Sequence, residues 1–149
     1  MITFEVLTPL PKPLKKTDLV QLPACLKRAR GLKQDRVISV RFVSSADIRQ
    51  LNKTYRGLDR PTDVLSFGAE PVPGLRSSNK QAWLGDLAIC VSYAATEAKR
   101  RSIDVREELI RLLVHGALHL AGYDHATPEE EQNMFVLQEQ CVSCMMNRV

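Results

Sequence analysis

The sequence predicts an α+β domain in which a small four-stranded mixed sheet packs on one buried central helix, with about five helices in all. Two observations predict this class. Short segments with strand-like alternation are interspersed among longer segments with helical periodicity. One helical segment, residues 104–121, carries apolar side chains around nearly its whole circumference, as a helix buried on all sides does. The length of 149 residues suits one domain, and we expect residues 1–149 to form it.

The first half of the chain is expected to supply two strands and two helices. Residues 2–7 alternate between apolar and polar side chains like a short strand. After a proline-rich stretch, a helix is expected over about residues 14–30, and a glycine closes it. Residues 37–43 alternate as a half-buried strand does, and Ser44 then offers an N-cap for a helix that extends to about residue 55.

Two further strands are expected at residues 64–67 and 83–91. The segment Gly68–Lys80 between them is rich in glycine, proline and serine, so we expect a mobile loop there.

Three helices are expected to complete the fold, at residues 92–101, 104–121 and 128–146. The capping pair Asp104 and Glu107 is predicted to open the second of these. Thr127, a following proline and Glu130 supply the N-cap, the first helical residue and the capping-box acid of the last.

Composition favours a soluble cytoplasmic protein with reduced thiols. The N-terminal residues include an early acid and three prolines, and no apolar run is long enough to span a membrane. With 44% hydrophobic residues, a chain of this length does not need disulfides to hold its fold. Cys141 and Cys144 form a C-x-x-C pattern that suits a redox pair or an extra metal site, but packed or exposed helix cysteines are the favoured interpretation.

The net charge of +4 indicates a mild preference for polyanionic partners. Basic residues gather in separate clusters, at residues 27–33, at Arg56 and Arg60, and at residues 99–101. Any one cluster is explained by a solvated helix face, whereas several together slightly favour contact with phosphates.

All three histidines, His115, His119 and His125, lie within the stretch 115-HGALHLAGYDH-125. The i, i+4 spacing puts the first two rings on one helix face, and Gly122 allows the chain to reverse and return the third. Three imidazoles suit one zinc ion, or nickel, copper or cobalt, with a fourth position left for water as in catalytic zinc sites. The suggested chemistry is hydrolysis.

The spacing matches the metzincin zinc proteases and a zincin-like fold, with one departure. Those proteases carry a glutamate, the general base of peptide hydrolysis, where this chain has Gly116. The metal-binding pattern is therefore present without the base that a peptidase requires.

The histidine stretch resembles the signature of the YbeY family of bacterial metal-dependent endoribonucleases. The segments 51-LNKTYRGLDRPTDVLSF-67 and 84-LGDLAI-89 resemble the two other hallmarks of that family, in the expected order. The resemblance implies one zinc ion on His115, His119 and His125, cleavage of single-stranded RNA, 16S rRNA 3′-end maturation, 70S ribosome quality control and partnership with the small ribosomal subunit. It also implies that Arg56 is a functional arginine near the metal, where a guanidinium would hold a phosphate; from the residue alone, a surface salt bridge is equally natural.

Several alternatives stay open at the level of sequence. One alternative function is a zinc peptidase. Another is a non-catalytic ribosome assembly factor in which a metal, with Cys144 as its fourth ligand, links a loop to a helix. For a nuclease, attack by water and attack by the 2′-hydroxyl of the RNA both remain possible. Residues near the motifs that suit either a supporting role in the site or a structural one are Asp63, Asp86, Tyr123 and Asp124.

Overall fold

The structure, a computed structural model, describes residues 1–68 and 83–147, so the expected loop Gly68–Lys80 lies outside the described residues except for Gly68. In this part of the chain the predicted α+β class is confirmed, with five helices and a four-stranded mixed sheet. The elements in chain order are β1 (Thr3–Val6), α1 (Lys16–Leu26), β2 (Val37–Val43), α2 (Ser45–Arg56), β3 (Val64–Phe67), β4 (Trp83–Cys90), α3 (Val91–Arg101), α4 (Val105–Leu120) and α5 (Pro128–Met146).

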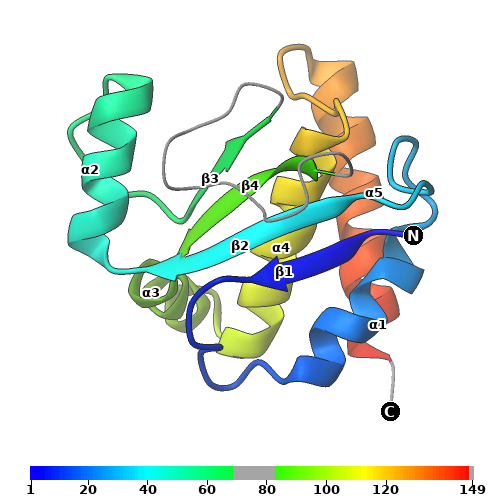
Figure 1. Ribbon diagram of the computed structural model, residues 1–149, viewed down its shortest axis with the longest axis horizontal. Helices are drawn as coiled ribbons and strands as arrows, with labels where there is room; N and C mark the ends of the chain where they lie inside the picture. The colour runs from blue at the N-terminus through cyan, green and yellow to red at the C-terminus, as the bar shows by residue number, and fades with distance from the viewer. Residues whose placement is uncertain (69–82, 148–149) are drawn as a thin grey trace.

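The strands are arranged in the order β1-β2-β4-β3 (Figure 1). β1 pairs with β2 and β2 pairs with β4 in parallel, whereas β3 runs antiparallel to β4 at the edge of the sheet. In this register Asp86 of β4 lies opposite Ser39 on one side and Phe67 on the other.

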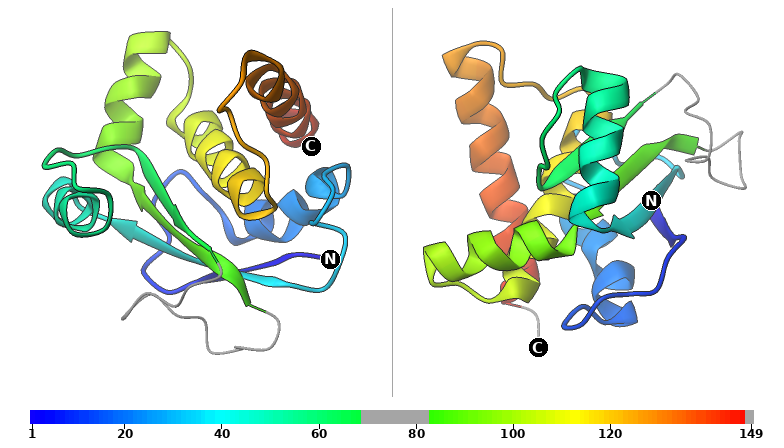
Figure 2. Two further views of the ribbon diagram at one scale, coloured as in Figure 1. Left: turned by 90° about the horizontal axis from the view of Figure 1, so that it is seen from above. Right: turned by 90° about the vertical axis from the view of Figure 1, so that its left-hand side faces the viewer.

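The two faces of the sheet are covered unequally. Seen from above, α1, α3, α4 and α5 lie on one side of the sheet, and α2 lies apart from them, beyond the end of β2 (Figure 2). Alternate residues of β4 face the two sides, because successive side chains of a strand point in opposite directions. Leu87 and Ile89 join the large core with α1, α4 and α5, while Ala88 and Cys90 join a smaller cluster with Ile48 of α2.

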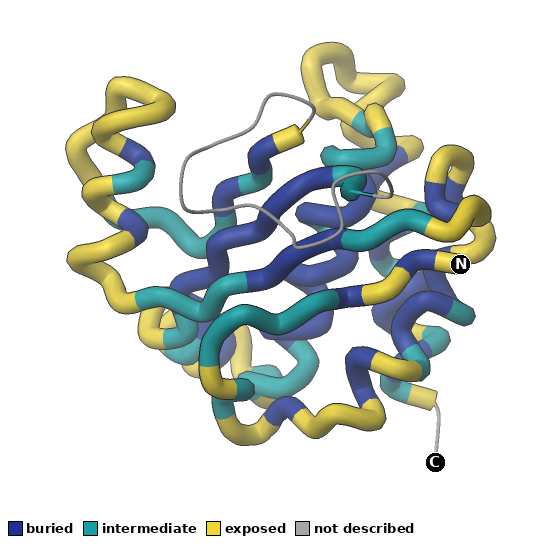
Figure 3. Tube along the Cα trace, viewed as in Figure 1, coloured by how far each residue is buried: buried dark blue, intermediate teal, exposed yellow. Residues whose placement is uncertain are grey.

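Helix α4 is the central helix of the large core, as its apolar circumference predicts. Leu109, Ile110, Leu113 and Leu118 are completely buried on it, and Figure 3 shows the buried centre of the fold behind the sheet. Such a helix is held from several sides and forms a rigid platform for the residues near its C-terminal end. No helix in the described part of the chain is long and apolar enough to cross a membrane.

The predicted N-caps are confirmed at all three helix starts, but the predicted capping hydrogen bonds form at only two of them. The Ser44 hydroxyl accepts a hydrogen bond from the Asp47 amide at 3.1 Å, and the Thr127 hydroxyl accepts one from the Glu130 amide at 3.1 Å. Asp104 makes no side-chain capping bond. Its expected partner Glu107 instead accepts a hydrogen bond from Arg111, one turn further along α4.

Helix α1 ends at Leu26, earlier than the predicted residue 30. The Ala29 amide donates to the Leu26 carbonyl and the Leu32 amide to the Ala29 carbonyl, so the chain continues in tight turns. The sequence pattern alone does not distinguish these turns from a last helical turn, because both place apolar residues three apart.

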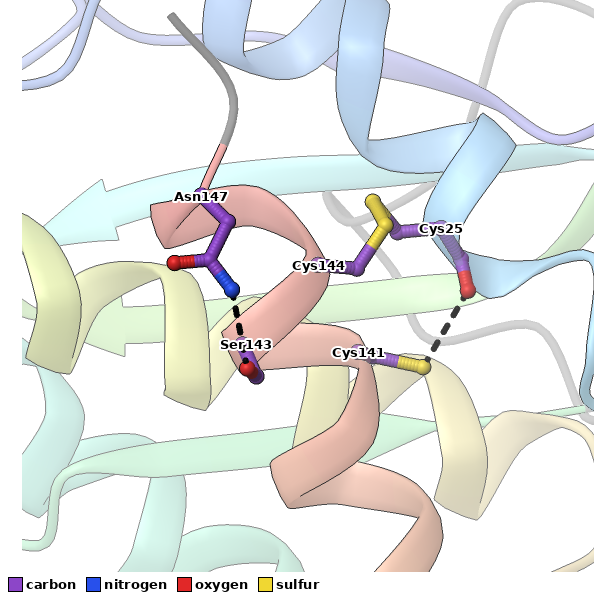
Figure 4. Close-up of a disulfide and its surroundings, with 5 residues drawn as sticks. All are labelled: Cys25, Cys141, Ser143, Cys144 and Asn147. Carbon is purple, nitrogen blue, oxygen red and sulfur yellow. Dashed lines mark hydrogen bonds between the residues drawn. A yellow bond between two sulfur atoms is a disulfide. The ribbon is translucent and has the colours of Figure 1, made fainter.

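The prediction of four reduced cysteines is wrong for two of them. Cys25 of α1 and Cys144 of α5 form a disulfide, with their Cα atoms 5.9 Å apart (Figure 4). Cys141 is a buried free thiol whose Sγ donates to the Cys25 carbonyl, and burial raises its pKa to about 11. The pairing joins residues 119 apart in sequence, a distance at which spacing rules for neighbouring cysteines give no signal.

Candidate metal centre

Two of the three histidines lie one turn apart on the C-terminal half of α4. The ring centres of His115 and His119 are 4.7 Å apart, and both residues are partly buried. Because the rest of this half of α4 is packed in the core, the positions of the two rings are set by a rigid element.

The third histidine is returned to this pair by a reversal of the chain at Gly122. Gly122 has φ +102°, a backbone conformation that residues with a side chain rarely adopt. Its amide donates to the His119 carbonyl and the Tyr123 amide donates to the Leu118 carbonyl, both at 3.0 Å. This bond pair is the Schellman arrangement that ends a helix. It leaves the exposed His125 ring 5.2 Å from His119 and 6.4 Å from His115, centre to centre.

The ring spacings are close to those that a bound metal would impose. Zinc–nitrogen bonds of about 2.0–2.1 Å at tetrahedral angles place neighbouring imidazole centres roughly 5 Å apart. Two of the three pairs fall near that spacing, and the His115–His125 pair is longer. Accordingly, within residues 1–68 and 83–147 the structure contains no group of three or more His, Cys, Asp or Glu side chains that is arranged to hold a metal ion. The three imidazoles fit a metal in their chemistry, provided that His125 moves inward from its exposed turn.

A glutamine on α5 fixes the orientation of His115. Gln138 Oε1 lies 2.8 Å from His115 Nδ1, and Gln138 Nε2 donates to Glu139 Oε2 at 3.1 Å. Because the Gln138 amide nitrogen donates to the Glu139 carboxylate, the Gln138 amide oxygen faces the ring. An amide oxygen only accepts hydrogen bonds, so His115 Nδ1 carries the proton. The lone pair of His115 is therefore on Nε2, which is the state that a metal ligand needs.

The glutamine is in turn held by a charge network that includes buried Arg111 and partly buried Glu139. Arg111 of α4 donates two hydrogen bonds to Glu139, both at 2.9 Å, and a third to Glu107 at 3.1 Å. The bond from Arg111 lowers the pKa of Glu139, and Glu139 raises the pKa of Arg111. Sequence reasoning missed this network; its one available signal was Arg111, a charged residue within an otherwise apolar stretch.

The electrostatic environment favours the neutral form of His119. Burial lowers the pKa of His119, and repulsion from His115 and His125 lowers it further. A neutral imidazole has a free lone pair, so the environment favours the form that can bind a metal.

Arg56, the expected catalytic arginine, is the last residue of α2 and is exposed. Its Nη2 donates to the Ser66 carbonyl at 2.6 Å, and its guanidinium lies 5.1 Å from the centre of the Phe67 ring. The structure therefore places Arg56 against β3, and its contacts within the described residues do not include a histidine or a carboxylate. The surface salt bridge that the residue type allows is not formed there.

The presence of a glycine at residue 116 is explained by close packing, which the sequence did not reveal. Gly116 is buried, and a Cβ atom added there would lie 2.5 Å from Cδ2 of Leu87 on β4. Helix α4 thus touches the sheet at this residue, and the glutamate that metzincin proteases carry at the same place would have to displace Leu87.

The other polar residues near the motifs have structural contacts. The Asp63 carboxylate accepts from the Val64 amide at 2.7 Å at the start of β3, and Asp124 accepts from the His125 amide at 2.7 Å. The Tyr123 hydroxyl accepts from the Arg30 amide at 3.0 Å. Asp86 is buried on β4.

Comparison with known proteins identifies a family. The family model described as Endoribonuclease YbeY matches residues 13–145. A protein named Endoribonuclease YbeY from Sulfurihydrogenibium sp. (strain YO3AOP1) is 47% identical over 103 residues, which cover 68% of this chain and 65% of that protein. A protein of the same name from Brevibacillus brevis is 40% identical, with 93% and 94% of the two chains covered. The chain thus spans just under two thirds of the first relative and nearly all of the second.

The fold comparison agrees with the sequence comparison. The solution structure of a protein from Thermotoga maritima superposes with a TM-score of 0.61 at 30% sequence identity. The superposition covers 97% of this chain and 89% of the other.

Proposed function

The chain belongs to the Endoribonuclease YbeY family, and from this premise we propose that it is a zinc-dependent endoribonuclease that hydrolyses phosphodiester bonds of single-stranded RNA. The observation that carries the proposal is the gathering of His115, His119 and His125 at the end of a buried helix, with the tautomer of His115 fixed by Gln138. The proposal extends to 16S rRNA 3′-end maturation and 70S ribosome quality control in the cytoplasm, with the small ribosomal subunit as partner.

The three histidines would hold one zinc ion, and a bound ion would supply Lewis-acid activation of the phosphodiester or of its attacking oxygen. His115 and His119 would provide the fixed part of the site, since both are carried by α4. His125 would close the site from its exposed turn.

Arg56 would bind the phosphate. A guanidinium donates two parallel hydrogen bonds to phosphate oxygens, a geometry that lysine does not offer. To do so, Arg56 would exchange its bond to the Ser66 carbonyl for bonds to the RNA. Because Arg56 is exposed, this exchange requires no unfolding of α2.

Both rival functions have lost structural support. A metzincin-like peptidase carries its general base at the place of Gly116, and here that residue is a glycine packed against the Leu87 side chain. A stapling metal with Cys144 as fourth ligand needs a thiolate, but Cys144 is paired with Cys25.

The test compares cleavage of one labelled RNA in single-stranded and duplex form by four preparations: the wild type, His115→Ala, Arg56→Ala and the matched control Arg49→Ala. Arg49 is an exposed arginine on the same helix as Arg56, paired with Asp59. We expect zinc-dependent cleavage of the single strand by the wild type and Arg49→Ala, no cleavage and reduced zinc content for His115→Ala, and slower cleavage with normal zinc content for Arg56→Ala.

Equal cleavage by all four preparations would show a contaminating nuclease and contradict the proposal. If zinc removal instead lowers the melting temperature sharply and no preparation cleaves, the metal is structural. The ends of the products separate the two chemical routes, because a 2′,3′-cyclic phosphate excludes attack by external water in the first step.

A further inference from the structure

A cavity of about 660 Å³ opens directly beside the histidines. His115 and His125 line it from α4 and the turn that follows, and Gln132, Met134 and Phe135 line it from the first half of α5. We call this cavity the α5 groove. Any group bound in it would be a neighbour of a phosphate held at the histidines.

Away from the histidines, the charges of the α5 groove do not favour phosphate as its occupant. Apart from the two histidines, Glu131 is the only ionisable side chain among the described residues that line it, and none of them is lysine or arginine. A carboxylate repels phosphate, whereas it accepts hydrogen bonds from uncharged N–H groups. Gln132 adds a second exposed polar side chain with both donors and an acceptor. The lining therefore suits an uncharged group with its own donors and acceptors.

Phe135 supplies the apolar part of the α5 groove. Its side chain is 55% exposed, although a phenylalanine on a helix of this core would gain free energy by burial. Exposed aromatic rings on single-strand-binding proteins serve as platforms on which bases stack. The adjacent Val136 is also exposed, at 43%, but lines a different cavity, which Phe135 borders as well.

We propose that the α5 groove binds an unpaired nucleobase of the nucleotide next to the scissile phosphodiester, stacked on Phe135 and hydrogen-bonded by Gln132. This inference rests on the proposed ribonuclease function and deepens it. It also gives single-strand preference a physical origin, because a base enters the groove only after it has left a helical stack. A duplex would present a phosphate to the histidines and leave the groove empty.

The test is an abasic scan of one short single-stranded RNA, with affinity measured by fluorescence anisotropy in EDTA and cleavage measured after zinc is added. Wild-type affinity is expected to fall at one abasic position, next to the cleaved bond, by roughly 5- to 150-fold, the range of base stacking on an aromatic ring. The affinity of Phe135→Ala for the intact RNA is expected to be lower than that of the wild type by the same factor. Removing the base at that position should then cause no further loss of affinity. Phe135→Tyr retains a ring and should restore both affinity and position dependence, and Val136→Ala should behave as the wild type.

The outcomes separate this inference from the function on which it rests. If wild type cleaves RNA and His115→Ala does not, but Phe135→Ala keeps the wild-type affinity and abasic profile, the function stands and the groove proposal is overturned. A flat abasic scan in the wild type also overturns it, since affinity that depends on no base means that no base is bound in the groove. If the wild type neither binds nor cleaves RNA, the proposed function fails, and the inference fails with it.

Discussion

Gln138 Oε1 lies 2.8 Å from His115 Nδ1, and this contact connects α5 to the first histidine of the candidate metal centre. Gln138 is not itself one of the candidate metal ligands. Its amide sets which ring nitrogen carries the proton, and the Glu139–Arg111 pair sets the orientation of the amide.

Replacing Gln138 with alanine is expected to weaken zinc binding by about 10- to 100-fold, the usual effect of losing the group behind a ligand histidine. The expected cause is that the His115 ring loses its fixed tautomer and orientation. Competition with a chromophoric chelator measures the affinity. Gln140→Ala, an exposed glutamine on the same helix, is the control. Unchanged affinity in Gln138→Ala would show that α4 alone orients the ring.

Replacing Gly116 with alanine is expected to destabilise the fold by up to about 2 kcal/mol. Overpacking against Leu87 costs about 1–3 kcal/mol, and the better helix propensity of alanine returns about 1 kcal/mol. Urea unfolding of Gly116→Ala, Leu87→Ala and the double variant provides the measurement. The double variant should lose less than the two single losses combined, because the truncated leucine makes room for the new methyl group. Additive losses would mean that the two residues do not compete for space.

The ion pair between Asp18 of α1 and Arg106 of α4 is expected to make stability depend on acidic pH. Arg106 donates to both carboxylate oxygens, at 3.2 and 2.6 Å. Burial acts to raise the pKa of Asp18, but the bonds from Arg106 and the Lys15 amide outweigh it and hold that pKa below its ordinary value of 3.8. A lowered folded-state pKa gives stability that is present above the ordinary value and lost as the pH falls through the folded one.

Asp18→Asn should therefore cost about 2 kcal/mol at pH 7, and its difference from the wild type should shrink as the pH drops below 3.8. Urea titrations of the two proteins at pH 7 and at successively lower pH check the sign. A difference that grows towards acid would contradict the assignment of this carboxylate as ionised in the folded protein.

The Cys25–Cys144 disulfide is expected to stabilise the fold by restricting the unfolded chain. For a loop closed across 119 residues, the loss of chain entropy amounts to roughly 5 kcal/mol as an upper bound. Cys144→Ser should lower the free energy of unfolding by part of that amount, and reduction of the wild type should lower it similarly. Reductant should have no further effect on Cys144→Ser. If reduction leaves the stability of the wild type unchanged while mass spectrometry confirms four free thiols in place of two, the cross-link contributes no stability.

Features that depend on neighbours in the chain were predictable from the sequence. The bounds of β2 and β3, the N-caps Ser44 and Thr127, and the burial of α4 follow from alternation, from capping chemistry and from apolar periodicity. The placement of His115 and His119 on one helix face, and the reversal at Gly122, are local in the same way. The local part of the candidate site therefore follows from residue order and spacing alone.

Features that depend on contacts between distant segments required the tertiary structure. The strand order, the Cys25–Cys144 pairing, the contact of Gly116 with Leu87 and the bond from His115 to Gln138 all join residues that local rules treat as independent. Helical periodicity shows that α4 is apolar on nearly all sides, but it does not show which residues of α4 and α5 meet. That pairing is decided when side chains of both helices pack into one core, since the best packing is a property of the whole set of contacts and not of either segment.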